Sequence, residues 1–164
     1  MRLTTPRLAA PMRLVLALLP SIFLSACLTG PDRCPLNPSD PTHETFAPAL
    51  GVNIATMERT DLGDYRKDLV VGTGDVLTSL TAVQIHYSAY LANGTLIDEV
   101  QDQPFPIDLN ARATIGLADG MLGMAIGGTR LIVAPSELAL GACDNGPVPG
   151  NSTIVYRVEL LAIN

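Results

Sequence analysis

The chain has 164 residues and a formal net charge of −6 at pH 7, and 48% of its residues are hydrophobic. This length suffices for one domain with a substantial core. The acidic balance argues against nucleic acid as a partner and against peripheral binding to anionic lipid, because both call for clusters of Lys and Arg.

The N-terminal part predicts an export signal. An apolar run at 14–24 is too short to cross a membrane and suits the central region of a signal peptide. This run is preceded by three arginines, all within the first 13 residues. Because Met12 stands directly before Arg13 and the run, a chain that starts at Met12 would also carry a complete signal.

Residues 24–27 read LSAC, which resembles the lipobox of bacterial lipoproteins. In that family the Cys, here Cys27, carries diacylglycerol, and cleavage occurs directly before it. The resemblance implies a signal peptide at 1–26 and attachment to the membrane through the acyl chains on Cys27. Leu28 favours the outer membrane, since an Asp there would indicate inner-membrane retention in enterobacteria. A plain secretory signal with an incidental Cys, or a buried apolar helix, is the alternative.

Acylation of Cys27 would leave an even number of cysteines. Cys34 and Cys143 are then the remaining pair, and in an oxidising compartment we predict a disulfide between them. The alternative is two free thiols that lie too far apart to bridge. Cleavage also removes three arginines and no acid, so that 7 basic and 16 acidic residues leave the mature chain with a net charge of −9.

Residues 27–45 predict an extended tether, and residues 46–164 the folded domain. Four prolines stand among Asp, Asn, Ser and Gly in this region: Pro31, Pro35, Pro38 and Pro41. Such a composition is typical of an extended spacer and not of a packed element. The tether is therefore expected to lift the domain off the membrane.

The rest of the chain predicts strands joined by turns, and one short helix. A strand from Tyr65 ends at Gly72-Thr73-Gly74, which lacks the third glycine and the following helix of a nucleotide-binding loop. A period-two pattern at 81–91 leads into Asn93-Gly94, a strong hairpin signal. Further extended segments are expected at 95–98, 104–109, 129–134 and 153–163, and the helix at 115–122. Together they indicate an α+β fold with a curved antiparallel sheet packed on one short helix.

No metal site, cofactor or nucleophilic catalytic set is expected. The two histidines, His43 in the tether and His86 on the strand face opposite Tyr87, are too distant to share a metal ion. The sequon Asn151-Ser152-Thr153 is incidental in a bacterial lipoprotein.

Six blocks of sequence, in this order and spacing, resemble an FKBP-type peptidyl-prolyl cis-trans isomerase over residues 65–164. They read GDYRKDLVVGTG, VQIHYSAYLANGTLID, PFPIDL, TIGLADG, ELALG and TIVYRVELL. The resemblance implies the FKBP-like fold, in which a curved antiparallel sheet wraps around one short α-helix. It also implies an enzyme that needs neither a nucleophile nor a cofactor.

The resemblance places the substrate pocket residue by residue. The positions that match the family's catalytic residues are Tyr87, Asp98, Phe105, Ile115 and Tyr156. The positions that match its other substrate-binding residues are Ile97, Thr114, Leu117, Leu140 and Val148. In the family the backbone N–H at the position of Ile115 donates to the ligand, and the carboxylate at the position of Asp98 lies near the hydroxyl at the position of Tyr87.

Three pocket positions depart from the family pattern. Ile97 stands for Phe, Leu117 for Trp and Leu140 for Tyr, and IGLADG is one residue shorter than the usual block. The floor of the pocket is then less aromatic, and one hydrogen bond to the substrate is lost, at a cost of about 0.5–1.5 kcal/mol. Reduced activity and weak binding of macrolide ligands are expected.

The resulting expectation is a peptidyl-prolyl isomerase, or rotamase, that assists the folding of exported proteins. It would face the periplasm from its lipid anchor and take Pro-containing polypeptides as clients. The aliphatic floor leaves an alternative open, a weakly active or inactive FKBP-like binding module or chaperone for a Pro-containing envelope partner. A monomer is expected, because the sequence shows no dimerisation helix before the domain.

Overall fold

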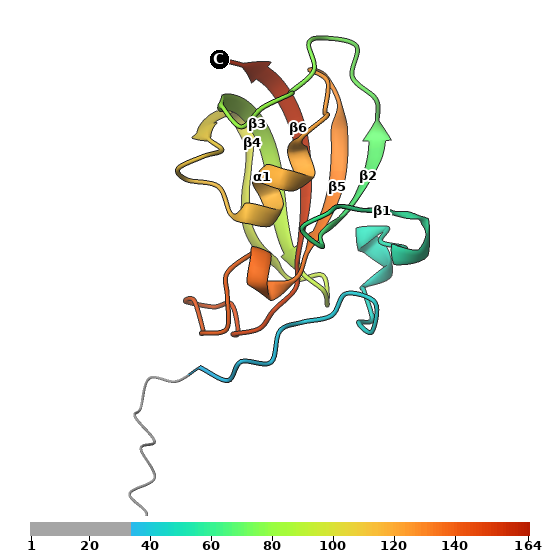
Figure 1. The fold of residues 1–164 in the computed structure, drawn as a ribbon, viewed down its shortest axis with the longest axis vertical. Helices are drawn as coiled ribbons and strands as arrows, with labels where there is room; N and C mark the ends of the chain where they lie inside the picture. The colour runs from blue at the N-terminus through green and yellow to red at the C-terminus, as the bar shows by residue number, and fades with distance from the viewer. Residues whose placement is uncertain (1–33) are drawn as a thin grey trace, which may run out of the picture. The chain divides into compact units, whose positions relative to one another are not determined.

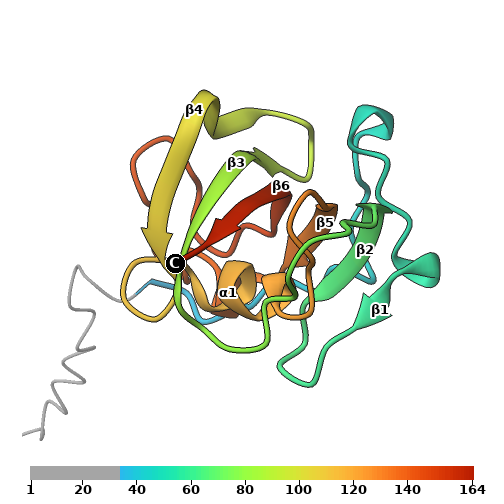
Figure 2. The ribbon, with the colours of Figure 1, turned by 90° about the horizontal axis from the view of Figure 1, so that it is seen from above.

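The computed structural model describes residues 34–164, so the predicted signal peptide, the predicted lipidation site at Cys27 and the first part of the predicted tether lie outside the described residues. Six strands form one antiparallel sheet in the order β1-β2-β5-β6-β3-β4, which curves around helix α1 (Figures 1 and 2). The elements are β1 (Glu58–Arg59), β2 (Tyr65–Val70), β3 (Ala82–Leu91), β4 (Leu96–Asp108), α1 (Ile115–Met121), β5 (Thr129–Ala134) and β6 (Ile154–Ile163). The predicted α+β fold class is confirmed.

Apolar side chains pack on both faces of the central strands. Along β5, Ile132 and Ala134 belong to the main core with α1, whereas Leu131 and Val133 belong to a second core on the opposite face. Residues 46–57 cover this second core and contain two short 3-10 helices, η1 (Pro48–Leu50) and η2 (Ile54–Thr56). Burial on both faces explains why most of β5 reads as a continuous apolar run.

Two glycines let α1 approach the sheet closely. A Cβ on Gly120 would lie 2.5 Å from Cγ2 of Ile132, and a Cβ on Gly116 would lie 2.5 Å from Cβ of Ala134. Glycine costs a helix about 1 kcal/mol relative to alanine, so its presence here is explained by the close contact with β5. At the start of α1 the Thr114 hydroxyl accepts the N–H of Leu117 at 3.3 Å, which fixes the first turn.

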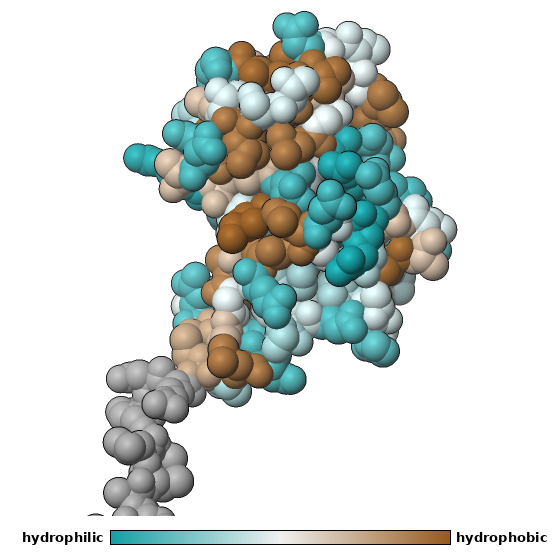
Figure 3. All heavy atoms as spheres, viewed as in Figure 1, coloured by the Kyte–Doolittle hydropathy of each residue, from teal (hydrophilic) through white to brown (hydrophobic). Residues whose placement is uncertain are grey.

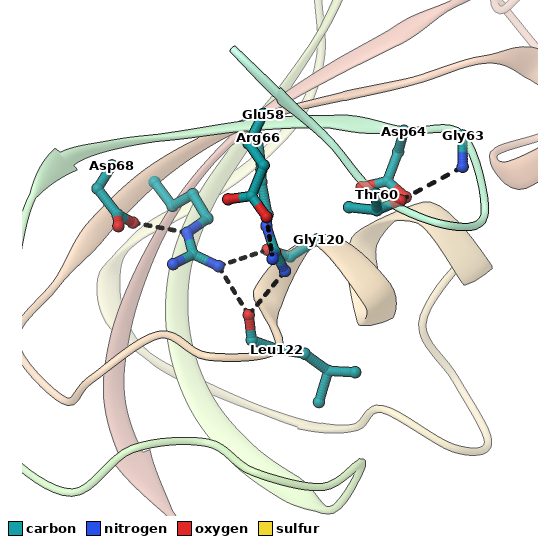
Figure 4. A network of polar contacts seen from close by, with 9 residues as sticks. Glu58, Thr60, Gly63, Asp64, Arg66, Asp68, Gly120 and Leu122 are labelled. Atoms are coloured by element: carbon teal, nitrogen blue, oxygen red, sulfur yellow. Dashed lines mark hydrogen bonds and ion pairs between the residues drawn. The ribbon is translucent and has the colours of Figure 1, made fainter.

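The C-terminal end of α1 is held by two arginines that reach it from the sheet (Figure 4). Arg130 of β5 and Arg66 of β2 both donate to the carbonyl oxygen of Leu122, at 2.8 and 3.1 Å. Cations are favourable at this end of a helix because its free carbonyl groups carry partial negative charge. Asp68 and Glu58 accept from these two arginines, at 2.6 and 2.7 Å, and so fix both guanidinium groups.

A buried carboxyl group lies beside this network, on the turn between β1 and β2 (Figure 4). The side chain of Asp64 is fully buried, and its Oδ1 accepts the Thr60 hydroxyl at 2.6 Å. Its Oδ2 has no hydrogen-bond partner among the residues that the structure describes. Burial, and after it the neighbouring carboxyl of Asp119 on α1, raises the pKa of Asp64 to about 6, although the Thr60 hydrogen bond acts in the other direction.

This raised pKa predicts that Asp64 makes the fold less stable as the pH rises. Between the unfolded pKa of 3.8 and the folded pKa of about 6 the native state binds more protons than the unfolded chain, so the free energy of unfolding falls from about pH 4 to pH 7. Asp64→Asn should flatten this part of the profile, as measured by urea unfolding at several pH values. Asp61→Asn, on the exposed part of the same turn, is the control. An unchanged slope in Asp64→Asn would contradict this role.

The strands differ from the sequence-based expectation in two places. The segments expected at 95–98 and 104–109 are parts of one long strand, β4, which pairs with β3 along its length with two register shifts. Pro104 and Pro106 are tolerated in this strand because it lies at the edge of the sheet. An N–H that faces away from the neighbouring strand is not needed for a hydrogen bond between strands. The two-residue strand β1 and the short helices of 46–57 were not predicted.

The expectation that residues up to 45 form an unpacked tether is wrong for residues 34–45. Ser39 and Ser136 exchange two hydrogen bonds, from each backbone N–H to the other hydroxyl oxygen, at 3.1 and 2.8 Å. Asn151 donates to the carbonyl oxygen of Pro35 at 2.8 Å. These contacts hold the segment on the loop after β5. Composition alone suggested a spacer, because the partners of these contacts are about 100 residues away in the sequence.

Cys34 and Cys143 are joined in a disulfide, with their Cα atoms 5.0 Å apart. The bridge fixes the same segment to the same loop. Among the described helices, none is long and apolar enough to cross a bilayer.

Candidate active site

A cavity of about 480 Å³ lies on the concave face of the sheet, beside α1. In Figure 3 apolar side chains border a notch at the left edge of the molecule, at the level of α1 in Figure 1. The residues that line the cavity are Tyr87, Ala89, Ile97, Asp98, Phe105, Pro106, Ile107, Arg112, Ala113, Thr114, Leu117, Leu140 and Tyr156.

A small residue at the centre of the sheet creates the hollow. Ala89 of β3 stands between Asp98 of β4 and Tyr156 of β6 in the strand register. Its side chain is 3% exposed and lines the cavity, whereas its two neighbours in the row carry larger side chains. The row is therefore low at Ala89, and the cavity extends over it between the two larger side chains.

One wall carries an aromatic pair with a fixed hydroxyl. The Tyr87 hydroxyl donates to Oδ2 of Asp98 at 2.5 Å, so the carboxylate lies where the family resemblance implied. The rings of Tyr87 and Phe105 are 5.7 Å apart between centroids and inclined by 56°, within the favourable range for an aromatic pair. Burial, followed by the Asp98 hydrogen bond, raises the pKa of Tyr87, so the hydroxyl stays protonated at neutral pH.

The floor of the cavity is mainly aliphatic, with one buried hydroxyl. Leu117 of α1 is buried in the main core, and Leu140 packs against the same core from the loop after the short 3-10 helix η3 (Ser136–Leu138). The Tyr156 hydroxyl lies 3.1 Å from the Thr114 hydroxyl, which also caps α1. Burial raises the pKa of Tyr156. The hydrogen bond between the Tyr156 and Thr114 hydroxyls ties β6 to the start of α1.

Eight of the ten predicted pocket residues line the cavity together, and two do not. Ile115, the first residue of α1, has a side chain that is 57% exposed and lies outside the cavity lining. Its expected contribution was a backbone N–H and did not require the side chain to line the pocket. Val148 is 5% exposed and packs in the main core, so its side chain is not at the rim of the pocket.

Five lining residues were not predicted. Ala89 and Ile107 follow Tyr87 and Phe105 by two positions on the same strands, so the period of a strand would have placed them on the same face. Pro106, Arg112 and Ala113 gave no such signal. The last two lie on the loop between β4 and α1, whose path the sequence does not show.

A sequence model of the FKBP-type peptidyl-prolyl cis-trans isomerases matches residues 74–161, which is more than half of the chain and includes every residue that lines the cavity. The chain belongs to this family. The resemblance read from the six sequence blocks is thereby confirmed at the level of the family.

Relatives support the same assignment. An FK506-binding protein of Neisseria meningitidis serogroup B is 36% identical over 101 residues, which are 59% of this chain and 93% of that protein. The human peptidyl-prolyl cis-trans isomerase FKBP2 is 42% identical over 94 residues, which are 55% of this chain and 62% of that protein.

Solved structures of two bacterial proteins resemble the chain with a TM-score of 0.61 each. FkpA from Escherichia coli is 26% identical, and the match covers 66% of this chain and 51% of FkpA, so the chain spans about half the length of FkpA. A peptidyl-prolyl cis-trans isomerase from Pseudomonas syringae is 25% identical, and the match covers 66% of this chain and 80% of that structure.

The Tyr87–Asp98 hydrogen bond predicts the effect of a single substitution in this FKBP-type site. Tyr87→Phe keeps the ring beside Phe105 but leaves the Asp98 carboxylate without its donor. We expect kcat/KM for a prolyl peptide to fall by about three- to tenfold, which corresponds to the loss of one hydrogen bond. Tyr90→Phe, on the same strand but outside the cavity, is the control. Equal losses in the two variants would contradict the assignment.

Proposed function

We propose that this chain is a peptidyl-prolyl cis-trans isomerase that assists the folding of exported proteins in the bacterial envelope. The observation that carries the proposal is the apolar cavity on the concave face, which is lined by the aromatic side chains of Tyr87, Phe105 and Tyr156 and in which Asp98 is held by a hydrogen bond. Pro-containing polypeptides are the proposed clients, and the chain is proposed to act as a monomer.

The chemistry requires no acid–base group. Rotation about a prolyl amide has a barrier of roughly 18–20 kcal/mol, because the planar amide must lose its resonance. The twisted amide has less charge separation than the planar one, so an apolar site that excludes water binds it better. Binding the twisted state more tightly than the planar state lowers the barrier.

Each part of the cavity has a role in this mechanism. Tyr87, Phe105 and the aliphatic floor exclude water from the proline ring and the amide. The Tyr87–Asp98 hydrogen bond fixes one polar edge of the pocket, and the Tyr156–Thr114 hydrogen bond fixes the opposite one. The backbone N–H of Ile115 is the proposed donor to a substrate carbonyl, as the family resemblance implies.

A binding module of little or no activity is the second candidate. The observation in its favour is the floor, where Leu117 and Leu140 line the cavity in place of the Trp and Tyr that the family pattern has at these positions. Such a groove would hold a Pro-containing segment of an envelope partner without accelerating its isomerisation. Weak binding of macrolide ligands is proposed on the same ground.

A protease-coupled assay on a peptide with an apolar residue before proline separates the two candidates. If the chain is an isomerase, the wild type accelerates the reaction and Phe105→Ala reduces the rate. If the wild type is inactive but still binds the peptide, and Leu117→Trp with Leu140→Tyr restores the rate, the binding module is supported. Absence of both activity and peptide binding in folded protein would overturn both.

We propose that a lipid on Cys27 anchors the protein in the outer membrane and that the domain faces the periplasm. The LSAC sequence supports the anchor, and the Cys34–Cys143 disulfide supports an oxidising compartment. Mass spectrometry of the mature N-terminus tests the proposal: a diacylated Cys27 is expected, and Cys27→Ala should release the protein from the membrane fraction. Unmodified Cys27 in membrane-extracted protein would contradict it.

A further inference from the structure

Arg112 is a cation in a cavity that otherwise offers almost no charge. Of the residues that line the cavity, Asp98 is the one acidic residue and Arg112 the one basic residue. Asp98 is already engaged by the Tyr87 hydroxyl. Arg112 has an exposed side chain and, within residues 34–164, makes no ion pair and no side-chain hydrogen bond. Its guanidinium group is therefore available to a ligand.

The backbone that carries Arg112 is held in place. Leu109 is buried and donates its N–H to the carbonyl oxygen of Thr81 at 3.2 Å. The N–H of Arg112 then donates to the carbonyl oxygen of Asp108 at 2.9 Å, which closes a turn. Asn110 donates from its side chain to the carbonyl oxygen of Leu80 at 2.7 Å. An arginine on an anchored loop is better suited to recognise a ligand than one on a free loop.

We propose that Arg112 is a specificity-determining residue, which binds a carboxylate of the client close to the proline that occupies the cavity. This inference rests on the proposed prolyl-isomerase function and names the substrate class of the same site. A planar guanidinium group binds a carboxylate through two parallel hydrogen bonds. The carboxylate is either the side chain of an Asp or Glu that flanks the proline, or the C-terminal carboxylate of the client.

The charge of the whole chain limits which clients fit. The protein is acidic, with 16 acidic and 10 basic residues in the full sequence, so a client with many negative charges is repelled at long range. A single carboxylate next to the proline gains the short-range contact with Arg112 without this cost. The preferred client segment is therefore neutral or basic overall, with one acid beside the proline.

The test compares amidated peptides that contain one proline and carry Glu, Gln or Lys at each flanking position in turn. A further pair, with proline as the last residue, differs only in a free or amidated C-terminus. The isomerisation rate is measured by NMR exchange on each peptide, and binding of the same peptides by calorimetry. We expect Glu at one flanking position, or the free C-terminus, to raise kcat/KM about two- to fivefold over its neutral counterpart. High salt should reduce this difference in kcat/KM between the charged peptide and its neutral counterpart.

Variants at Arg112 decide the inference. Arg112→Gln should bring the ratio of kcat/KM for the Glu peptide to that for the Gln peptide to one, and Arg112→Glu should reverse the preference toward Lys. Arg157→Gln, an exposed arginine outside the cavity, makes the same change in net charge and should leave the ratio unchanged. A ratio of one at every position in the wild type, or an unchanged ratio in Arg112→Gln, would overturn the inference.

Failure of the isomerase function and failure of the proposed role of Arg112 give different results. If the wild type does not isomerise even the Gln peptide, the proposed isomerase function fails, and the calorimetric Glu/Gln ratio still reports on Arg112. If the Gln peptide is isomerised and no acidic peptide is preferred, the isomerase function stands and the role of Arg112 is wrong.

Discussion

Ala89→Leu is expected to remove most of the isomerase activity while the fold stays intact. The Ala89 side chain points into the open space between Asp98 and Tyr156, so three additional carbon atoms would occupy the volume that the proline ring needs. Ala89 belongs to the main core but also lines a cavity of about 480 Å³, so the added atoms can extend into the cavity and the strain should be smaller than at a core position without one. We expect kcat/KM to fall about 100-fold, equivalent to about 2.7 kcal/mol.

The measurement combines the isomerase assay with thermal unfolding of the same preparation. Ala82→Leu at the start of the same strand is the matched control, because it adds the same side chain outside the cavity. The control should keep its activity, and both variants should keep a cooperative transition. Wild-type kcat/KM in folded Ala89→Leu would show that the proline does not bind above Ala89, and the assignment of the site would have to be abandoned.

The sequence predicted the site better than it predicted the packing around it. Tyr87, Asp98 and Phe105 lie in motifs whose local pattern determines both the strand and the face, so their positions could be predicted. Val148 was misplaced because the loop between η3 and β6 has no period that tells an inward from an outward side chain. Arg112 was missed for the same reason, since it lies on a loop where no pattern shows direction.

The docked segment at 34–45 shows a second limit. Its prolines and polar residues are typical of a spacer, and nothing local distinguishes a spacer from an extended segment that rests on a domain. What holds it are partners far along the chain, such as Ser136 for Ser39 and Thr153 for Glu44. The predicted disulfide gave the only hint, because a bridge from Cys34 to Cys143 requires this segment to lie against the domain.

Loss of the disulfide is expected to have the largest effect on stability. Cys34 and Cys143 are 109 residues apart, so the bridge restricts nearly the whole unfolded domain. For a closed loop of this length the chain-entropy estimate is about 4–5 kcal/mol, and we expect Cys143→Ser to lower the free energy of unfolding by about 4 kcal/mol. Urea unfolding, in a Cys27→Ser background so that no third thiol interferes, measures the effect.

The comparison with Ser39→Ala separates the bridge from the contacts around it. That variant removes the hydroxyl that accepts the Ser136 N–H at 2.8 Å but keeps the disulfide, and it should cost only about 1 kcal/mol. Equal unfolding free energies for the oxidised and the reduced protein would show that the bridge adds nothing. Because the bridged loop also carries Leu140 into the cavity, reduction should loosen the floor of the site. The isomerase assay on reduced protein, at a temperature where it remains folded, should then show a higher KM with a smaller change in kcat.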